Sequence, residues 1–411
     1  MTDRTKGATD AQSDSSVAKP DAGAKPAEDS GGTGRTTGDG SMTRGSGGRR
    51  WRRPRWLRIE VVILPLLLLY PFFPVLDQLV QSVFDISLRL DRQLVNIFIF
   101  AILALALNLQ VGYAGLLQLG IAAFFAIGAF STGILTVGKY PFQIGFWGAL
   151  VAAPALAGTA GPALGAPTIR LRGDYLAIVT LGFGEVTRVV LLNLENITDG
   201  SRGLNPIPTP WLPDWLTRAA AGDATGRMHF LTMYYVALAL LAGLVIVFRT
   251  LERTRQGREF VALREDELVA ACMGINPART KLIAFAAGAA IAGLAGALYA
   301  TNLTTTAEPN TYDFTYSIMV LCCVIIGGLG SLRGVLLGAA VLLTFDNVLS
   351  PLLTNLIQRQ LSGGSSNVLA SFTNWRWLVF GLALVLMMRL RPEGLWPSSR
   401  VKAELHREEE I

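Results

Sequence analysis

The sequence predicts an all-α polytopic integral membrane protein with about ten transmembrane helices, and eight to ten are compatible with the pattern. Hydrophobic residues make up 51% of the 411 positions and charged residues only 16%. The apolar residues gather in long blocks, as membrane-spanning helices require. Lys and Arg number 36 against 30 Asp and Glu, and much of this excess falls in the N-terminal tail and in loops on one side of the predicted membrane. Because the positive-inside rule explains that excess, nucleic acid is not an expected partner.

The first 50 residues are expected to form a disordered cytosolic tail. They consist mainly of Gly, Ser, Thr, Ala, Asp and Lys, which bury too little apolar surface to offset the entropy of ordering. A run of arginines between Arg49 and Arg58 then precedes an apolar stretch at 59–76. That stretch is long enough to span and lacks a small-residue cleavage site, so it predicts an uncleaved first helix. The transmembrane domain is predicted over 51–397 and a cytosolic C-terminal tail over 398–411.

Nine further apolar stretches complete the predicted spans. They lie at 94–111, 114–137, 142–165, 175–193, 229–249, 282–301, 315–328, 334–350 and 376–390. Threading the chain from a cytosolic N-terminus places Arg170, Arg172 and the charged loop 249–281 on the cytosolic side, together with the C-terminal tail. This distribution predicts that both termini are cytosolic. The stretch 175–193 carries charge and 315–328 is short, so either could be re-entrant or broken where protein or a water-filled cavity surrounds the backbone.

The loop 249–281 predicts a short amphipathic helix. Apolar residues recur at near-helical spacing from Leu268 to Ile275, and Gly274 ends the pattern. A helix lying on the membrane surface is the alternative, but such helices usually present a basic polar face, whereas acids stand beside bases here. The small side chains of Ala270 and Ala271 would let the surface of another protein approach closely.

Polar residues inside the predicted spans are candidates for a transport path. Glu185 and Arg188 are three residues apart and share one helical face, and an intramembrane charge pair is a functional candidate because it is costly. A structural ion pair explains the same residues. Asn108, Gln118 and Thr180 are polar in apolar surroundings, where they either form interhelical hydrogen bonds or face a substrate.

Three glycine-rich stretches could break helices or permit tight contact: GYAG at 112–115, LGFG at 181–184 and GGLGSLRG at 327–334. Small residues allow transmembrane helices to pack closely. They also permit broken helices whose backbone groups meet a substrate near the middle of the membrane. The first and third stretches are faintly alike, which hints at an internal repeat.

Enzymatic and metal-binding patterns are absent from the sequence. Its two histidines, His229 and His406, are far apart, no Cys/His metal spacing occurs, and no Ser/His/Asp set can be placed on one side. The three cysteines form no disulfide framework and are expected to be free thiols. No G-x-x-x-x-G-K-[ST] phosphate loop is present. We therefore expect neither an enzyme nor a cofactor, and energy for transport would come from a partner or from an ion gradient.

The segment EDELVAACMGI resembles the docking segment of membrane subunits of ABC importers, with Glu267, Ala270, Ala271 and Gly274 at the matching positions. The variant spacing is similar to that of branched-chain amino acid permeases of the LivM type, within the LivHM/urea permease group. Further stretches resemble the same family in order, so that the similarity covers about 95–397; they lie at 112–130, 169–185, 196–208, 281–300, 324–339 and 380–397.

The resemblance implies a permease subunit of the bacterial inner membrane that takes up branched-chain or related amino acids. It implies a heterodimer with a related second permease subunit, two ATPase subunits that dock at 249–281, and a periplasmic substrate-binding protein. Glu267, Ala270, Ala271 and Gly274 would then couple the permease to the ATPase, and Gln118, Thr180, Glu185 and Arg188 are the substrate-path candidates. Uptake of urea or short amides is an alternative within the group. An ion-coupled secondary transporter, with Glu185 as the ion site, is the alternative from another class.

Overall fold

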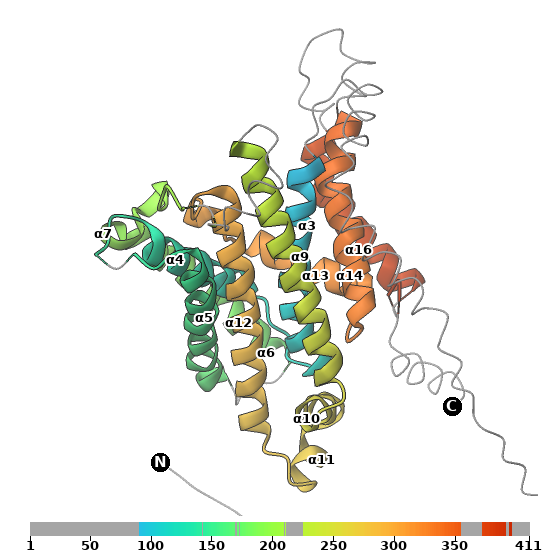
Figure 1. Cartoon of the computed structure of the whole chain (residues 1–411). Coiled ribbons are helices and arrows are strands. Elements are labelled where there is room, and N and C mark those ends of the chain that lie inside the picture. The colour runs from blue at the N-terminus through green and yellow to red at the C-terminus, as the bar shows by residue number, and fades with distance from the viewer. Residues whose placement is uncertain are drawn as a thin grey trace, which may run out of the picture. The chain divides into compact units, whose positions relative to one another are not determined.

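The computed structural model describes residues 90–208, 210, 225–354, 372–391 and 394–396, apart from positions 142, 169, 170 and 172. Helices are the only regular elements in this part of the chain (Figure 1). The two predicted tails, the first predicted span at 59–76, and Arg170 and Arg172 lie outside the described residues.

The longer helices match the sequence pattern. Within the described ranges, seven helices are long and apolar enough to cross a membrane, and two shorter apolar helices accompany them. The α-helices with more than ten residues are α3 (Leu90–Leu107), α4 (Ile121–Thr136), α5 (Phe146–Thr168), α6 (Asp174–Asn193), α9 (Thr225–Leu251), α10 (Arg255–Glu265), α12 (Pro277–Leu303), α13 (Phe314–Gly327), α14 (Leu332–Thr344) and α16 (Phe372–Leu390). Shorter elements are the π-helix η2 (Asn108–Tyr113), α7 (Glu195–Thr198), η3 (Gly200–Arg202), α11 (Glu267–Cys272), η4 (Pro309–Thr311) and the π-helix η5 (Phe345–Leu349). The prediction of an all-α polytopic membrane protein is confirmed.

One predicted span begins later than the sequence indicates. The stretch 114–137 reads as continuous, but residues 114–120 are irregular and α4 starts at Ile121. Gly115 has φ +70°, a left-handed conformation that does not propagate a right-handed helix. The backbone N–H of Leu119 donates to the side chain of Thr180 instead of to its own helix. By contrast, 175–193 is unbroken within α6, and 315–328 is unbroken up to Gly327, where α13 ends.

Helix α12 forms the centre of the packing and contacts α5, α4 and α3 (Figure 1). Its alanines and glycines let neighbouring backbones approach closely, as expected where lipid removes the hydrophobic driving force between helices. A Cβ added to Gly296 would overlap the carbonyl oxygen of Phe125 in α4. The glycine pattern at this contact is therefore a packing requirement.

We expect Gly296→Ala to destabilise the bundle by about 1–3 kcal/mol, because overpacking a tight contact forces backbones apart. Gly243→Ala in α9 is the matched control, since an added Cβ there meets nothing within 4 Å. Thermal unfolding in detergent should show a lower midpoint for the first variant alone. Equal midpoints for the two variants would contradict this account of the packing.

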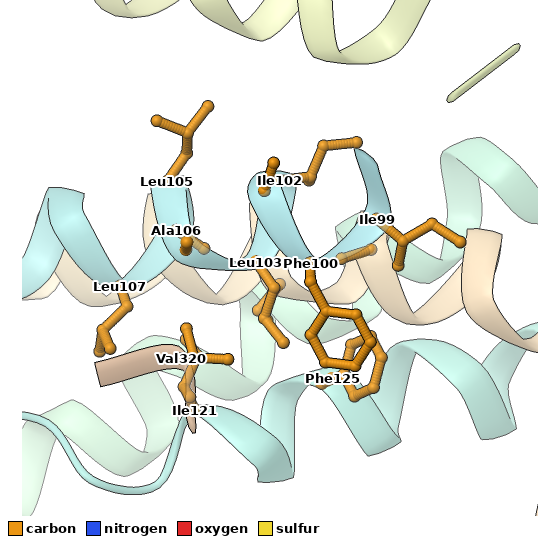
Figure 2. Packing of buried hydrophobic residues seen from close by; sticks show 14 of the residues in the cluster. Ile99, Phe100, Ile102, Leu103, Leu105, Ala106, Leu107, Ile121, Phe125 and Val320 are labelled. Atoms are coloured by element: carbon orange, nitrogen blue, oxygen red, sulfur yellow. The ribbon is translucent and has the colours of Figure 1, made fainter. Parts of the chain in front are cut away.

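The core is built around α3, whose side chains are buried on almost every side. Figure 2 shows Phe100 and Leu107 of α3 close to Phe125 and Ile121 of α4 and to Val320 of α13. The Phe100 and Phe125 rings lie 6.0 Å apart between centroids. A helix that is apolar all round belongs inside a bundle. Helix α3 therefore anchors the segment that follows it, which includes η2 and residues 114–120.

Candidate functional site

The charged loop folds into two consecutive short helices, α10 and α11, at one end of the bundle beneath α9 and α12 (Figure 1). We call this end the loop end. Asp266 separates the helices, and its Oδ1 accepts hydrogen bonds from the N–H groups of Leu268 at 2.7 Å and Val269 at 3.1 Å. This is an N-cap. After α11 ends at Cys272, Gly274 follows at φ +83°, as glycine commonly does beyond a helix C-terminus. The predicted helix is present, whereas α10 is an element that the sequence pattern did not single out.

Helix α11 is held on one side and open on the other. The Oε1 of Glu267 accepts a hydrogen bond from Nζ of Lys281 in α12 at 2.8 Å, and the Lys281 side chain is only 6% exposed. Ala270 is buried against the protein, whereas Ala271 and Gly274 are exposed. Large apolar residues stand on the open side; they are Leu268, Val269 and Met273, exposed to 71%, 57% and 79%.

Thr180 joins α6 to the irregular segment 114–120. Its hydroxyl donates to the carbonyl of Ala177 at 2.9 Å and accepts from the N–H of Leu119 at 3.1 Å. A Cβ on Gly120 would overlap the Thr180 carbonyl oxygen, so the two backbones touch. The predicted candidates Gln118 and Thr180 therefore lie in one neighbourhood.

Gln118 occupies this segment with an unsatisfied acceptor. The side chain is 1% exposed, and its Oε1 has no hydrogen-bond partner among the described residues. A buried amide oxygen without a partner costs about 1–3 kcal/mol. Helix α4 begins at Ile121, three positions after Gln118, and the N–H of Ala122 in its first turn donates to the hydroxyl of Ser317 in α13 at 3.2 Å. The positive end of the α4 dipole points toward the irregular segment.

Glu185 and Arg188 form the predicted ion pair on α6. The Arg188 Nε donates to both carboxylate oxygens of Glu185, at 3.0 Å and 3.1 Å, and its Nη1 donates to Asn310 of η4. The Glu185 side chain is 47% exposed. It lies on the exposed face of α6 with Ile178, Gly182 and Val189, whereas Thr180 is buried. The structure therefore places Glu185 and Thr180 on different faces of one helix.

At the end of the bundle opposite α11, the stretch 196–208 is ordered and packs on the 302–314 connection. The N–H of Leu204 donates to Oγ1 of Thr306 at 2.8 Å, and the N–H of Ile207 donates to the Thr304 carbonyl at 2.9 Å. Lys139 adds a hydrogen-bonded ion pair with Asp199. That carboxylate raises the pKa of Lys139 above its ordinary value.

No metal centre occurs in the described part of the chain, where no group of three or more His, Cys, Asp or Glu side chains comes together. Cys272 is exposed, Cys322 and Cys323 are buried, and all three are free thiols.

Comparison with known proteins identifies the family. The model of the family described as "Branched-chain amino acid transport system / permease component" matches residues 89–388. The high-affinity branched-chain amino acid transport system permease protein LivM of Escherichia coli is 38% identical over 322 residues, which cover 75% of this chain and 70% of the relative. A probable LivM of Methanocaldococcus jannaschii is 25% identical over 336 residues, covering 74% and 92% of the two chains.

A second kind of permease is also similar. The LivH permease protein of Escherichia coli is 24% identical over 255 residues, covering 59% of this chain and 79% of the relative. No solved structure matches the chain. Because the family model spans most of the chain and a relative of 38% identity agrees with it, the chain belongs to the family of permease components of branched-chain amino acid transport systems, and it is a multi-pass membrane transport component rather than an enzyme.

Proposed function

We propose that this chain is the membrane permease subunit of an ABC importer that takes up branched-chain or related amino acids across a bacterial inner membrane. Two separate ATPase subunits supply the energy, and one of them docks on α11. A periplasmic binding protein delivers the substrate, and a related permease subunit completes the path. The observation that carries the proposal is the exposed apolar side of α11, on a family member whose relatives are importer permeases by name.

The chemistry of α11 favours a protein partner over a lipid surface. Leu268 and Val269 on this six-residue helix and Met273 directly after it expose large apolar side chains, and Glu265 and Asp266 stand at its N-terminal side. A helix that binds anionic lipid carries bases around its apolar face, and acids there would be repelled. A groove in a protein can instead cover the apolar side chains and leave the acids at a polar rim. The Glu267–Lys281 contact holds the helix ready for such a partner.

The exposed face of α6 supports a second permease subunit beside this chain. A half-exposed carboxylate within an apolar span of 20 residues is costly in contact with lipid. Protein or a water-filled path next to Glu185 removes that cost. We therefore place the shared path along this face, with Glu185 and Arg188 at its wall near η4.

Gln118 and Thr180 mark a second point of the proposed path. The irregular segment 114–120 interrupts the apolar stretch between α3 and α4, and it contains an unsatisfied buried amide oxygen close to the N-terminal end of α4. The amide oxygen of Gln118 can accept a hydrogen bond from the ammonium group of an amino acid, and the positive end of the α4 dipole favours its carboxylate. In this proposal the segment is the closed constriction, which opens when substrate passes.

The deciding experiment is an uptake panel with the complete complex. The chain is co-expressed and purified with its candidate partner subunits, and vesicles are supplied with leucine, valine, glutamate, urea or a short amide. We expect leucine and valine uptake that requires ATP and persists when an uncoupler removes ion gradients. If the chain alone transported without ATP and an uncoupler stopped transport, the importer proposal would be wrong, and a preference for urea or amides would correct the substrate.

A further inference from the structure

The two glycine-rich turns that are far apart in the sequence meet at the loop end of α3. The N–H of Gly330, in the turn between α13 and α14, donates to Oδ1 of Asn108 in η2 at 2.9 Å. A Cβ on Gly112 would stand 2.5 Å from the backbone nitrogen of Gly330. The GYAG and GGLG turns are thus in backbone contact, which side chains at these positions would prevent.

Arg264, in the last turn of α10, covers this contact. Its Nη1 donates to the carbonyl oxygen of Gly112 at 2.5 Å. A Cβ on Gly115 would stand 2.9 Å from Arg264 Cγ, and a Cβ on Gly330 would stand 3.0 Å from Nη1. One side chain from the loop therefore lies against both turns. We call Asn108, Gly112, Gly115, Arg264 and Gly330 the glycine junction.

We propose that Arg264 is the positioning residue through which movement of the docking helix α11 reaches the irregular segment 114–120. This inference rests on the proposed function, because it assumes that α11 binds the ATPase. Arg264 stands two positions before Asp266, whose side chain caps α11 and whose N–H bonds to the Ala262 carbonyl of α10. A displacement of α11 is therefore passed to the turn that carries Arg264.

On its other side, Arg264 contacts the segment that leads into the proposed transport path. The carbonyl held by Arg264 belongs to η2, and the chain runs from there directly into 114–120. That segment carries Gln118 and ends at the Leu119 hydrogen bond to Thr180. A π-helix has wider and weaker hydrogen bonding than an α-helix and is often found at functional positions. Because η2 has this geometry and glycines stand at 112 and 115, a pull on Gly112 moves the segment 114–120 at a lower free-energy cost than it would move a regular helix.

Arginine suits this role better than lysine. Its planar guanidinium has five N–H donors in a fixed fork, so it keeps a carbonyl bound over a range of angles. Its hydrogen bond to a carbonyl is charge-assisted and is stronger than a neutral one. A lysine retains the charge and the methylene groups that pack on Gly115, but it offers a single donor group.

The test compares Arg264→Ala and Arg264→Lys with Arg255→Ala in the reconstituted complex with its partner subunits. Arg255 is on the same helix, and the pair that the structure shows for it is an exposed one with Glu259. Three quantities are measured: ATPase subunits that co-purify, ATP hydrolysis stimulated by the substrate-loaded binding protein, and leucine taken up per ATP hydrolysed. We expect Arg264→Ala to keep the ATPase bound but to lower leucine per ATP about tenfold, which is within the usual range of coupling between sites. Arg264→Lys should fall between, and Arg255→Ala should match the unchanged complex.

The outcomes separate this inference from the proposed function. If the unchanged complex couples uptake to ATP and Arg264→Ala keeps the same ratio of leucine to ATP, Arg264 is not the transmitting residue. If Arg264→Ala releases the ATPase, or lowers uptake and hydrolysis in equal proportion, its role is structural and the inference is likewise wrong. Should the alanine variant fail to accumulate, Arg264→Lys and Asn108→Ala carry the same comparison. Loss of ATP-dependence in the unchanged complex would instead overturn the proposed function.

Discussion

Glu267→Arg should abolish ATP-dependent uptake while the chain still inserts into the membrane. The substitution removes the acceptor of the Lys281 hydrogen bond and places a second cation beside a lysine that is almost completely buried. Breaking a buried ion pair by changing one partner costs about 3–5 kcal/mol. The cost for this pair is smaller than that, because the Glu267 side chain is partly exposed and solvent screens its charge. The helix α11 would then leave its position against α12, and the apolar side chains of its open side would no longer be presented together.

The measurement is co-purification of the ATPase subunits, followed by uptake in vesicles. Glu259→Arg is the matched control, since it makes the same charge change within α10 at a residue whose ion pair, with Arg255, lies at the surface and away from α11. We expect the ATPase to remain bound in the control and to be lost from Glu267→Arg. If both variants lost the ATPase equally, general charge at the loop rather than the position of α11 would be responsible.

Thr180→Val should lower uptake about tenfold, since the lost hydrogen bond leaves the partly buried Leu119 N–H unpaired. Such a loss costs about 1–3 kcal/mol, and 1.4 kcal/mol is one factor of ten. Valine has nearly the shape of threonine, so helix packing is retained. The consequence falls on segment 114–120, whose attachment to α6 is this hydrogen bond together with the backbone contact at Gly120. Thr180→Ser keeps the hydroxyl and should keep most of the uptake.

Thr187→Val provides the control on the same buried face of α6. The Thr187 hydroxyl donates to the Phe183 carbonyl of its own helix at 3.0 Å and therefore holds no other segment. Initial rates of leucine uptake, normalised to the amount of assembled complex, are compared for the three variants. Equal losses in Thr180→Val and Thr187→Val would show that a hydroxyl within α6 matters generally and that the attachment of 114–120 does not.

The positions of most helices follow from local sequence. A run of apolar residues long enough to span has to satisfy its backbone internally, and a helix does so without help from other segments. This is why the predicted stretches 175–193 and 282–301 agree closely with α6 and α12. Gly274 similarly indicates the end of α11 because the left-handed conformation beyond a helix is a local requirement.

The break at 114–120 shows where local reasoning stops. The residues GLLQLG are apolar enough to continue a span, and only the glycines at its two ends, Gly115 and Gly120, indicate an interruption. The segment remains irregular because its amide groups find partners elsewhere, such as Thr180, which is 61 residues away in the sequence. A pattern with a period of 3.6 residues contains no information about such a partner.

The sequence by itself determined the fold class, most of the spans, the short helix of the charged loop and, through the matching segments, the kind of permease. Tertiary structure alone decided that Glu185 and Thr180 occupy different faces of α6, that Glu267 is tied to Lys281, and that Arg264 lies over two glycine turns. The physical reason is range. Helix formation and termination depend on neighbours within a few residues, whereas Arg264 and Gly112 are separated by 152 positions and Gly330 and Asn108 by 222. Such contacts arise only when the packed helices bring their ends together.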